Sequence, residues 1–203
     1  MKNCLIFAGG DFINYKNENN SFVICADSGY LNAVKNKIKP DLIIGDFDSY
    51  KDNLPNDIKI IRLPEIKDDT DLFYCVKEAI RLNFKDVTLI SCIGDRQDHN
   101  IAAYSSLLYL KEHGVNAKIV AKNLIAFILE NESTEIDKNV NYKYLSIIPI
   151  GKKASKISVS GVKYPLNNAE LTFNYPLGIS NEIIENKAQV AVLDGTVLIM
   201  QTN

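Results

Sequence analysis

Short apolar segments rich in Val, Ile and Leu recur along the first part of the chain, and most of them end in Gly or Asp. Runs of this kind are typical of strands that are buried on both faces of a sheet. We expect strands at residues 4–8, 21–26, 42–44, 58–63, 87–92 and 117–120. Because so many buried strands need cover on both faces, the helices of this region must pack on either side of them.

Helical periodicity occupies the intervals between these runs. Residues 70–82 place apolar side chains at i, i+3, i+4, i+7 and i+8, which predicts a helix with one buried face. Residues 98–113 predict a second helix that ends before Gly114, and residues 30–37 a shorter one. Strands that alternate with helices predict an α/β fold, with a mostly parallel sheet flanked by helices.

The pattern changes near residue 121, after which we expect strands alone. They are predicted at residues 124–129, 144–150, 156–159, 188–193 and 196–201. Asp194-Gly195 separates the last two and predicts a two-residue hairpin turn. We therefore divide the chain into an α/β domain at 1–121 and a small antiparallel β-sandwich or barrel domain at 122–203.

Composition narrows the class of protein. The chain has 23 Lys and Arg against 25 Asp and Glu, so it lacks the basic footprint of a nucleic-acid binder. Its apolar runs are too short for a signal-peptide core or a bilayer span, so we expect no membrane partner and a cytoplasmic location. The four cysteines form no C-x-x-C pair, and we expect them to be small buried apolar residues.

The segment from Leu42 to Ser49 is the most informative for chemistry. Asp46 and Asp48 follow a predicted buried strand, at the sheet edge where α/β proteins bind ligands. Two carboxylates held this close repel each other unless a cation lies between them, and Mg²⁺ prefers carboxylate and phosphate oxygens. A solvated turn would also explain this pair, and sugar transferases and haloacid-dehalogenase-type phosphatases use paired aspartates as well.

A second polar cluster, residues 67–71, lies where the helix at 70–82 begins. A helix N-terminus binds anions, and Lys67 can hold a phosphate as a point charge. Asp71 can add a third carboxylate to the metal site. The alternative is that Asp68, Asp69 or Thr70 only caps the helix.

A third cluster, residues 94–100, follows the strand at 87–92. Arg96 can bind phosphate, and Asp98 can accept hydrogen bonds from an amine-bearing ring. His99 could be a base, but a residue that orders the loop or caps the helix is the simpler interpretation. Asp27 repeats the pattern after the strand at 21–26. Four strand ends therefore carry Asp, although the chain has neither a G-x-x-x-x-G-K-[ST] loop nor a G-x-G-x-x-G motif.

Taken together, these clusters resemble thiamine pyrophosphokinase. Members of that family carry A-D-[GS]-G, G-D-F-D-S, K-D-x-T-D and G-x-R-x-D-H motifs in this order. The chain has Ala26-Asp27-Ser28-Gly29, Gly45-Asp46-Phe47-Asp48-Ser49, Lys67-Asp68-Asp69-Thr70-Asp71 and Gly94-Asp95-Arg96-Gln97-Asp98-His99. Gly178-Ile179-Ser180-Asn181-Glu182 resembles the S-N-E segment of the family. Ser28 stands where many relatives have Gly, and the absence of Trp makes the resemblance one to the bacterial type.

The resemblance implies a homodimer whose active site is shared between the α/β domain of one subunit and the β domain of the other. It implies Mg²⁺ held by Asp46, Asp48 and Asp71. The residues implied for ATP are Asp27, Ser28, Gly29, Lys67, Thr70 and Arg96. Those implied for thiamine are Asp98 and His99, together with Ser180 and Asn181 from the other subunit.

The implied reaction moves pyrophosphate from ATP to the hydroxyl of thiamine and releases AMP. Lys67 and Arg96 would stabilise the charge on the phosphates, and Asp48 or Asp71 would take the alcohol proton. Two other functions stay open at this point. One is a pyrophosphokinase that acts on a pterin alcohol, and the other is a metal- and nucleotide-binding sensor without catalysis.

Overall fold

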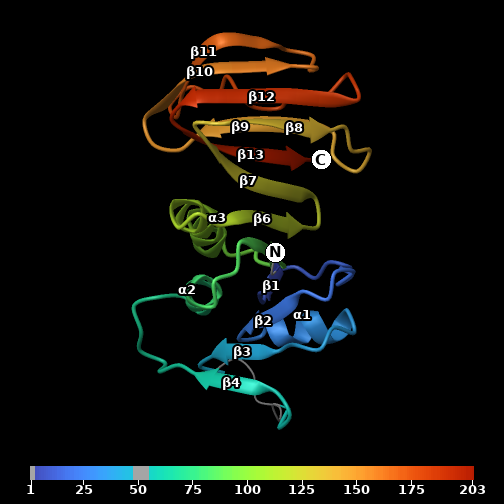
Figure 1. The fold of residues 1–203 in the computed structure, drawn as a ribbon, viewed down its shortest axis with the longest axis vertical. Helices are drawn as coiled ribbons and strands as arrows, with labels where there is room; N and C mark the ends of the chain where they lie inside the picture. The colour runs from blue at the N-terminus through green and yellow to red at the C-terminus, as the bar shows by residue number, and fades with distance from the viewer. Residues whose placement is uncertain (1–2, 48–54) are drawn as a thin grey trace. The chain divides into compact units, whose positions relative to one another are not determined.

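Six strands in the first part of the chain are parallel and hydrogen-bonded side by side. They are β1 Asn3–Phe7, β2 Phe22–Ala26, β3 Leu42–Gly45, β4 Lys59–Arg62, β5 Asp86–Ile90 and β6 Asn116–Ala121, in the order β4-β3-β2-β1-β5-β6 (Figure 1). The structure is a computed structural model that describes residues 3–47 and 55–203. It divides the chain into two units, Met1–Lys122 and Asn123–Asn203.

Three helices cover the parallel sheet, namely α1 Gly29–Lys35, α2 Asp71–Arg81 and α3 Gln97–Glu112. Side chains alternate between the two faces of a strand, yet all residues of β1 from Cys4 to Phe7 are buried. Leu5 and Phe7 share a cluster with Ala33 of α1, and α2 also packs on β1 and β2. Both faces of the sheet are therefore covered, which confirms the predicted α/β fold.

The strand order creates a crevice at one place along the edge of the sheet. From β1 the chain moves outward through β2 and β3 to β4, then returns to place β5 on the other side of β1. Phe7, at the end of β1, pairs with Cys25 on one side and Ile90 on the other. Where the direction of winding reverses in this way, the turns after the two central strands separate and leave room for a ligand.

The second unit is a β-sandwich. Its strands are β7 Leu124–Glu130, β8 Ser133–Asp137, β9 Tyr144–Pro149, β10 Lys153–Ser160, β11 Leu166–Thr172, β12 Lys187–Asp194 and β13 Thr196–Thr202. Antiparallel pairing joins β7-β13-β9 into one layer and β11-β10-β12-β8 into another. Leu129, Ile147, Ile157, Val190 and Ile199 belong to one buried cluster that both layers share, as the predicted sandwich requires.

The predicted hairpin at Asp194-Gly195 is wrong. β12 pairs with β8 and β10, and β13 pairs with β7 and β9, so both edges of each strand are already occupied. Gly195, with φ +114°, instead passes the chain from one layer to the other, and its N–H donates to Asn131 Oδ1 at 2.8 Å. A turn that passes between two sheets can need a residue with positive φ, just as a hairpin turn does. The Asp-Gly sequence therefore does not distinguish the two kinds of turn.

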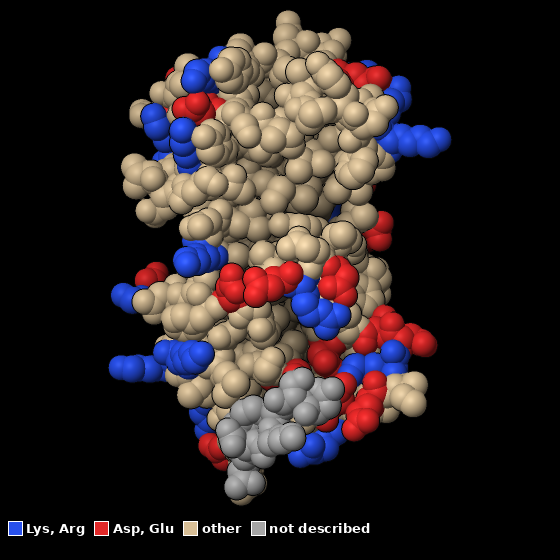
Figure 2. All heavy atoms as spheres, turned by 180° about the vertical axis from the view of Figure 1, so that it is seen from behind, with Lys and Arg blue, Asp and Glu red and all other residues tan. Residues whose placement is uncertain are grey.

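The expectations from composition concern the charged residues, the cysteines and membrane-spanning segments. Acidic and basic side chains are interspersed over the face seen in Figure 2. All four cysteines are buried and unbridged, as expected. Among the helices of residues 3–47 and 55–203, none combines the length and apolar character needed to cross a bilayer.

Candidate active site

A cavity of about 590 Å³ opens at the carboxyl ends of the strands of the first unit. Turns that follow β1, β2, β3 and β5 line it, together with the first residues of α2 and α3. The lining includes Asp27, Ser28, Asp46, Thr70, Asp71, Arg96 and His99 from the sequence motifs, along with Gly9, Gly10, Asp11 and Asn100. The structure therefore brings residues from all four predicted strand ends into one cavity.

Two buried asparagines hold the turns that line the cavity: Asn32, which no sequence motif includes, and Asn100, which ends the third cluster but for which the sequence predicts no role. Asn32 Nδ2 donates to the carbonyl oxygens of Ala8 at 2.8 Å and Gly10 at 3.1 Å. Asn100 Oδ1 accepts from the N–H of Gly94 at 3.0 Å, and its Nδ2 donates to the Gly94 carbonyl at 2.9 Å. In the sequence, the signal for holding a turn in this way is an Asn on the apolar face of a predicted helix, because a buried polar side chain needs a hydrogen-bond partner.

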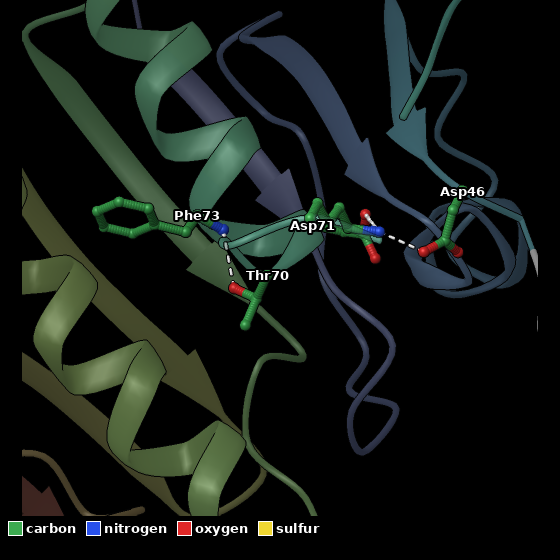
Figure 3. Close-up of polar contacts among 5 residues, drawn as sticks. Asp46, Thr70, Asp71 and Phe73 are labelled. Atoms are coloured by element: carbon green, nitrogen blue, oxygen red, sulfur yellow. Dashed lines mark hydrogen bonds and ion pairs between the residues drawn. The ribbon is translucent and has the colours of Figure 1, made fainter. Parts of the chain in front are cut away.

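Asp46, Lys67 and Asp71 form a largely buried charge cluster, and its two aspartates line the cavity. Figure 3 shows the carboxylates of Asp46 and Asp71 directed toward each other. The ammonium of Lys67 lies between them, hydrogen-bonded to Asp46 Oδ2 and 3.1 Å from Asp71 Oδ1. The side chains of Lys67 and Asp46 are only 8% and 11% exposed, and that of Asp71 is 23% exposed.

Burial and neighbouring charge shape the protonation of this cluster. Burial raises the pKa of the Asp71 carboxyl, Lys67 opposes that rise, and the carboxylates of Asp46 and Asp27 add to it. Burial alone would lower the pKa of Lys67, but its contacts with Asp46 and Asp71 outweigh this effect and raise the pKa. The carboxylates thus face one another closely enough to need a cation between them, and Lys67 supplies it.

The same geometry tests whether the residues fit a magnesium ion. Asp46 and Asp71 offer converging carboxylate oxygens at a place already occupied by a positive charge, which suits a hard cation. Within residues 3–47 and 55–203, no group of three or more His, Cys, Asp or Glu side chains is arranged to hold a metal ion. Asp48, the third predicted ligand, lies outside the described residues.

Thr70 is the N-cap of α2. Its Oγ1 accepts a hydrogen bond from the N–H of Phe73 at 3.2 Å (Figure 3). Asp69 instead pairs with Lys77 on the surface, at 2.5 Å. The capping alternative weighed for this cluster therefore describes Thr70, which also lines the cavity.

The residues at the start of α3 have a different character. Arg96 Nη2 pairs with Asp98 Oδ2 at 2.7 Å, and both side chains are 68% exposed. This arginine lowers the pKa of the Asp98 carboxyl. Arg96 and His99 line the cavity, whereas Asp98 is not among its lining residues.

Comparisons with known proteins match this architecture along the whole chain. The model of the family "Thiamin pyrophosphokinase, catalytic domain" matches residues 13–119, and that of "Thiamin pyrophosphokinase, vitamin B1 binding domain" matches residues 133–197. The chain belongs to the thiamin pyrophosphokinase family.

Individual relatives support the same assignment. The chain is 26% identical to thiamine pyrophosphokinase of Bacillus subtilis (strain 168), over 100% of this chain and 99% of that protein. It is 27% identical to thiamin pyrophosphokinase 1 of Caenorhabditis elegans, over 71% of this chain and 63% of that protein. The crystal structure of the Bacillus subtilis thiamine pyrophosphokinase has the same fold, with a TM-score of 0.91, 24% identity, and coverage of 100% of this chain and 99% of that one.

The part that matches the vitamin B1 binding domain contains Ser180 and Asn181. Ser180 is exposed, has φ +60°, and its N–H donates to Ser146 Oγ at 3.0 Å. Asn181 holds neighbouring backbone, since its Oδ1 accepts from the N–H of Tyr164 at 3.0 Å and its Nδ2 donates to the Tyr164 carbonyl at 2.7 Å. Asn181 therefore fixes the segment in which Ser180 is presented to solvent.

The cap at Thr70 leads to a stability prediction. Replacing Thr70 by Ala leaves the Phe73 N–H without its partner and should lower the free energy of unfolding by about 1 kcal/mol. Urea unfolding followed by circular dichroism measures this loss. Thr70→Ser retains the hydroxyl and should lose much less, so equal losses in the two variants would contradict the capping role.

Proposed function

We propose that this chain transfers the pyrophosphate group of ATP to the hydroxyl of thiamine, producing thiamine diphosphate and AMP, and that it does so in the cytoplasm. The observation that carries the proposal is the Asp46–Lys67–Asp71 cluster of a chain from this family, whose two aspartates line the strand-end cavity. Paired carboxylates next to a lysine and a helix N-terminus match what a metal-bound polyphosphate needs.

The nucleotide would bind in the cavity of the first unit. Asp46 and Asp71, with Asp48, would hold Mg²⁺, which neutralises charge on the polyphosphate. The turn formed by Asp27, Ser28 and Gly29 and the start of α2 at Thr70 would contact ATP. Lys67 and Arg96 would stabilise negative charge on the transferred and leaving phosphates.

The transfer itself joins the oxygen of the thiamine alcohol to the β-phosphorus of ATP and breaks the bond between that phosphorus and the oxygen bridging to AMP. The alcohol proton passes to Asp71 or Asp48. In the ligand-free protein, burial raises the pKa of the Asp71 carboxyl.

Thiamine would contact Asp98 and His99 of one subunit and Ser180 and Asn181 of the other, in a homodimer with a shared site. The segment that precedes Ser180 in the sequence supports an interface, since Phe173, Tyr175 and Leu177 are 70%, 65% and 50% exposed. Sedimentation at micromolar concentration tests this proposal. A dimer is expected, and a monomer that is fully active would contradict it.

The reaction is tested by incubating the protein with Mg²⁺, ATP and thiamine and separating the products chromatographically. Thiamine diphosphate and AMP should form in equal amounts. AMP formed only when a pterin alcohol replaces thiamine would assign a different acceptor, and nucleotide binding without any AMP would contradict catalysis.

Ser180 provides a test of the acceptor site. Ser180→Ala should raise the KM for thiamine several-fold and leave the KM for ATP nearly unchanged, because only a contact to the acceptor is lost. Steady-state kinetics with each substrate varied in turn measure both constants. Ser155→Ala, at a partly exposed position in the same unit, is the control. A change confined to the KM for ATP would remove Ser180 from the acceptor site.

A further inference from the structure

The position of Lys67 differs from that of Lys77 on α2. Its ammonium lies between the carboxylates of Asp46 and Asp71, and its side chain is only 8% exposed. Lys77 pairs with Asp69, and its side chain is 44% exposed. Lys67 thus occupies the place between two carboxylates where the proposed metal ion would have to bind.

We propose that Lys67 is the resident counter-ion of Asp46 and Asp71, and that Mg²⁺ reaches these carboxylates effectively only when a polyphosphate arrives with it and accepts Lys67. This inference rests on the proposed function, since it assigns Asp46 and Asp71 to the metal. It makes Lys67 the residue that selects the metal–nucleotide complex over the free ion.

The argument follows from charge. Without a cation, two buried carboxylates that face each other repel strongly, so Lys67 stabilises the ligand-free protein. A free metal ion cannot share that place with an ammonium, and expelling Lys67 would break both of its contacts with the aspartates. The ion must therefore compete with a charge that is already in position.

A nucleotide changes this balance. Its phosphates supply new acceptors for the ammonium, and the flexible four-carbon stem of lysine lets the charged group move while its backbone stays in place. Metal and nucleotide then favour each other's binding, and this coupling is reciprocal. Removing the ammonium should strengthen the binding of the ion alone and weaken the coupling.

The first test measures metal binding without nucleotide. Mn²⁺ has the same preference for carboxylate oxygens as Mg²⁺, and electron paramagnetic resonance counts its free form. Lys67→Met should bind Mn²⁺ alone about tenfold more tightly than the unmodified protein, and ATP should enhance that binding less. Lys77→Met removes a nearby exposed lysine and should leave Mn²⁺ affinity unchanged.

The result that overturns the proposal is a Lys67→Met variant that binds Mn²⁺ no more tightly than the unmodified protein. An equal gain in Lys67→Met and Lys77→Met would also overturn it, because net charge alone would then explain the effect. Circular dichroism of each variant establishes that the folded protein is being compared.

The second test uses the unmodified protein and needs no variant to fold. Acylation of lysine amines with an acetylating ester, followed by mass spectrometry, reports the accessibility of each amine. Without nucleotide, Mg²⁺ should increase acylation of Lys67 several-fold only at saturating concentrations, far above those at which Mg²⁺ binds together with ATP. ATP added with Mg²⁺ should protect Lys67 again. Lys77 is the internal reference, and Lys67 acylation that does not respond to saturating Mg²⁺ contradicts displacement.

These outcomes are separable from the proposed function. Suppose that thiamine diphosphate forms, but Lys67→Met does not change Mn²⁺ affinity and Mg²⁺ does not change acylation of Lys67. The counter-ion role then fails and the proposed reaction stands. If Lys67 behaves as expected but no thiamine diphosphate forms, the metal site stands and the acceptor assignment fails.

Discussion

Asp71→Asn should lower kcat/KM for Mg-ATP by at least about 100-fold. The substitution preserves the shape of the side chain but removes its charge, and with it one of the two described carboxylates proposed for the metal. Even changes to residues that only orient metal ligands lower affinity or activity by about 10–100-fold, so the loss of a ligand should exceed that range. Production of AMP at several Mg²⁺ concentrations measures the effect.

Asp69→Asn is the matched control for this variant. Asp69 lies in the same segment, but it pairs with Lys77 on the surface. Its replacement should change kcat/KM by less than about twofold, since exposed ion pairs contribute little. Turnover by Asp71→Asn within a few-fold of the unmodified protein would remove Asp71 from the metal site.

Gly29→Ala should lower the free energy of unfolding by about 3 kcal/mol, at the upper end of the usual cost of inserting a methyl group into a packed site. A Cβ atom at Gly29 would lie 2.1 Å from the carbonyl oxygen of Phe7 and 2.8 Å from Cα of Ala8. Both atoms belong to the backbone at the end of β1, so relief requires the strand or α1 to shift. Urea unfolding followed by circular dichroism measures the loss.

Gly94→Ala is the control for this prediction. Gly94 also lies in a turn that lines the cavity, but the nearest atom to its added Cβ is Cα of Gly10 at 3.4 Å. Its loss should stay below about 1 kcal/mol. Similar losses for the two variants would show that close approach to β1 is not what requires glycine at position 29.

The elements that the sequence predicts well are those with strong local periodicity. The buried runs of β1 and β3 and the apolar stripe of α2 each determine their own structure, and the strand alternation determines the fold class. The strands β8 Ser133–Asp137 and β11 Leu166–Thr172 were not predicted. Each carries mostly polar residues and only one buried position, so little in its own composition distinguishes it from a loop.

The candidate site shows the same division between local and long-range information. The Asp motifs at strand ends predict where the cavity lies, because parallel strands bring their carboxyl ends to one edge. The contact of Lys67 with Asp46 spans 21 residues and depends on how α2 packs against the sheet. The roles of Asn32 and Asn100 could not be predicted for a similar reason. Their hydrogen-bond partners are backbone groups that come close to them only when the chain folds.

A crystal structure with Mg²⁺, a non-hydrolysable ATP analogue and thiamine tests the central claim most directly. We expect carboxylate oxygens of Asp46 and Asp71 at about 2.0–2.1 Å from an ion that also binds the phosphates, with the Lys67 ammonium moved onto a phosphate oxygen. An ion bound to the analogue while Asp46 and Asp71 remain paired with Lys67, away from the metal, would contradict the account.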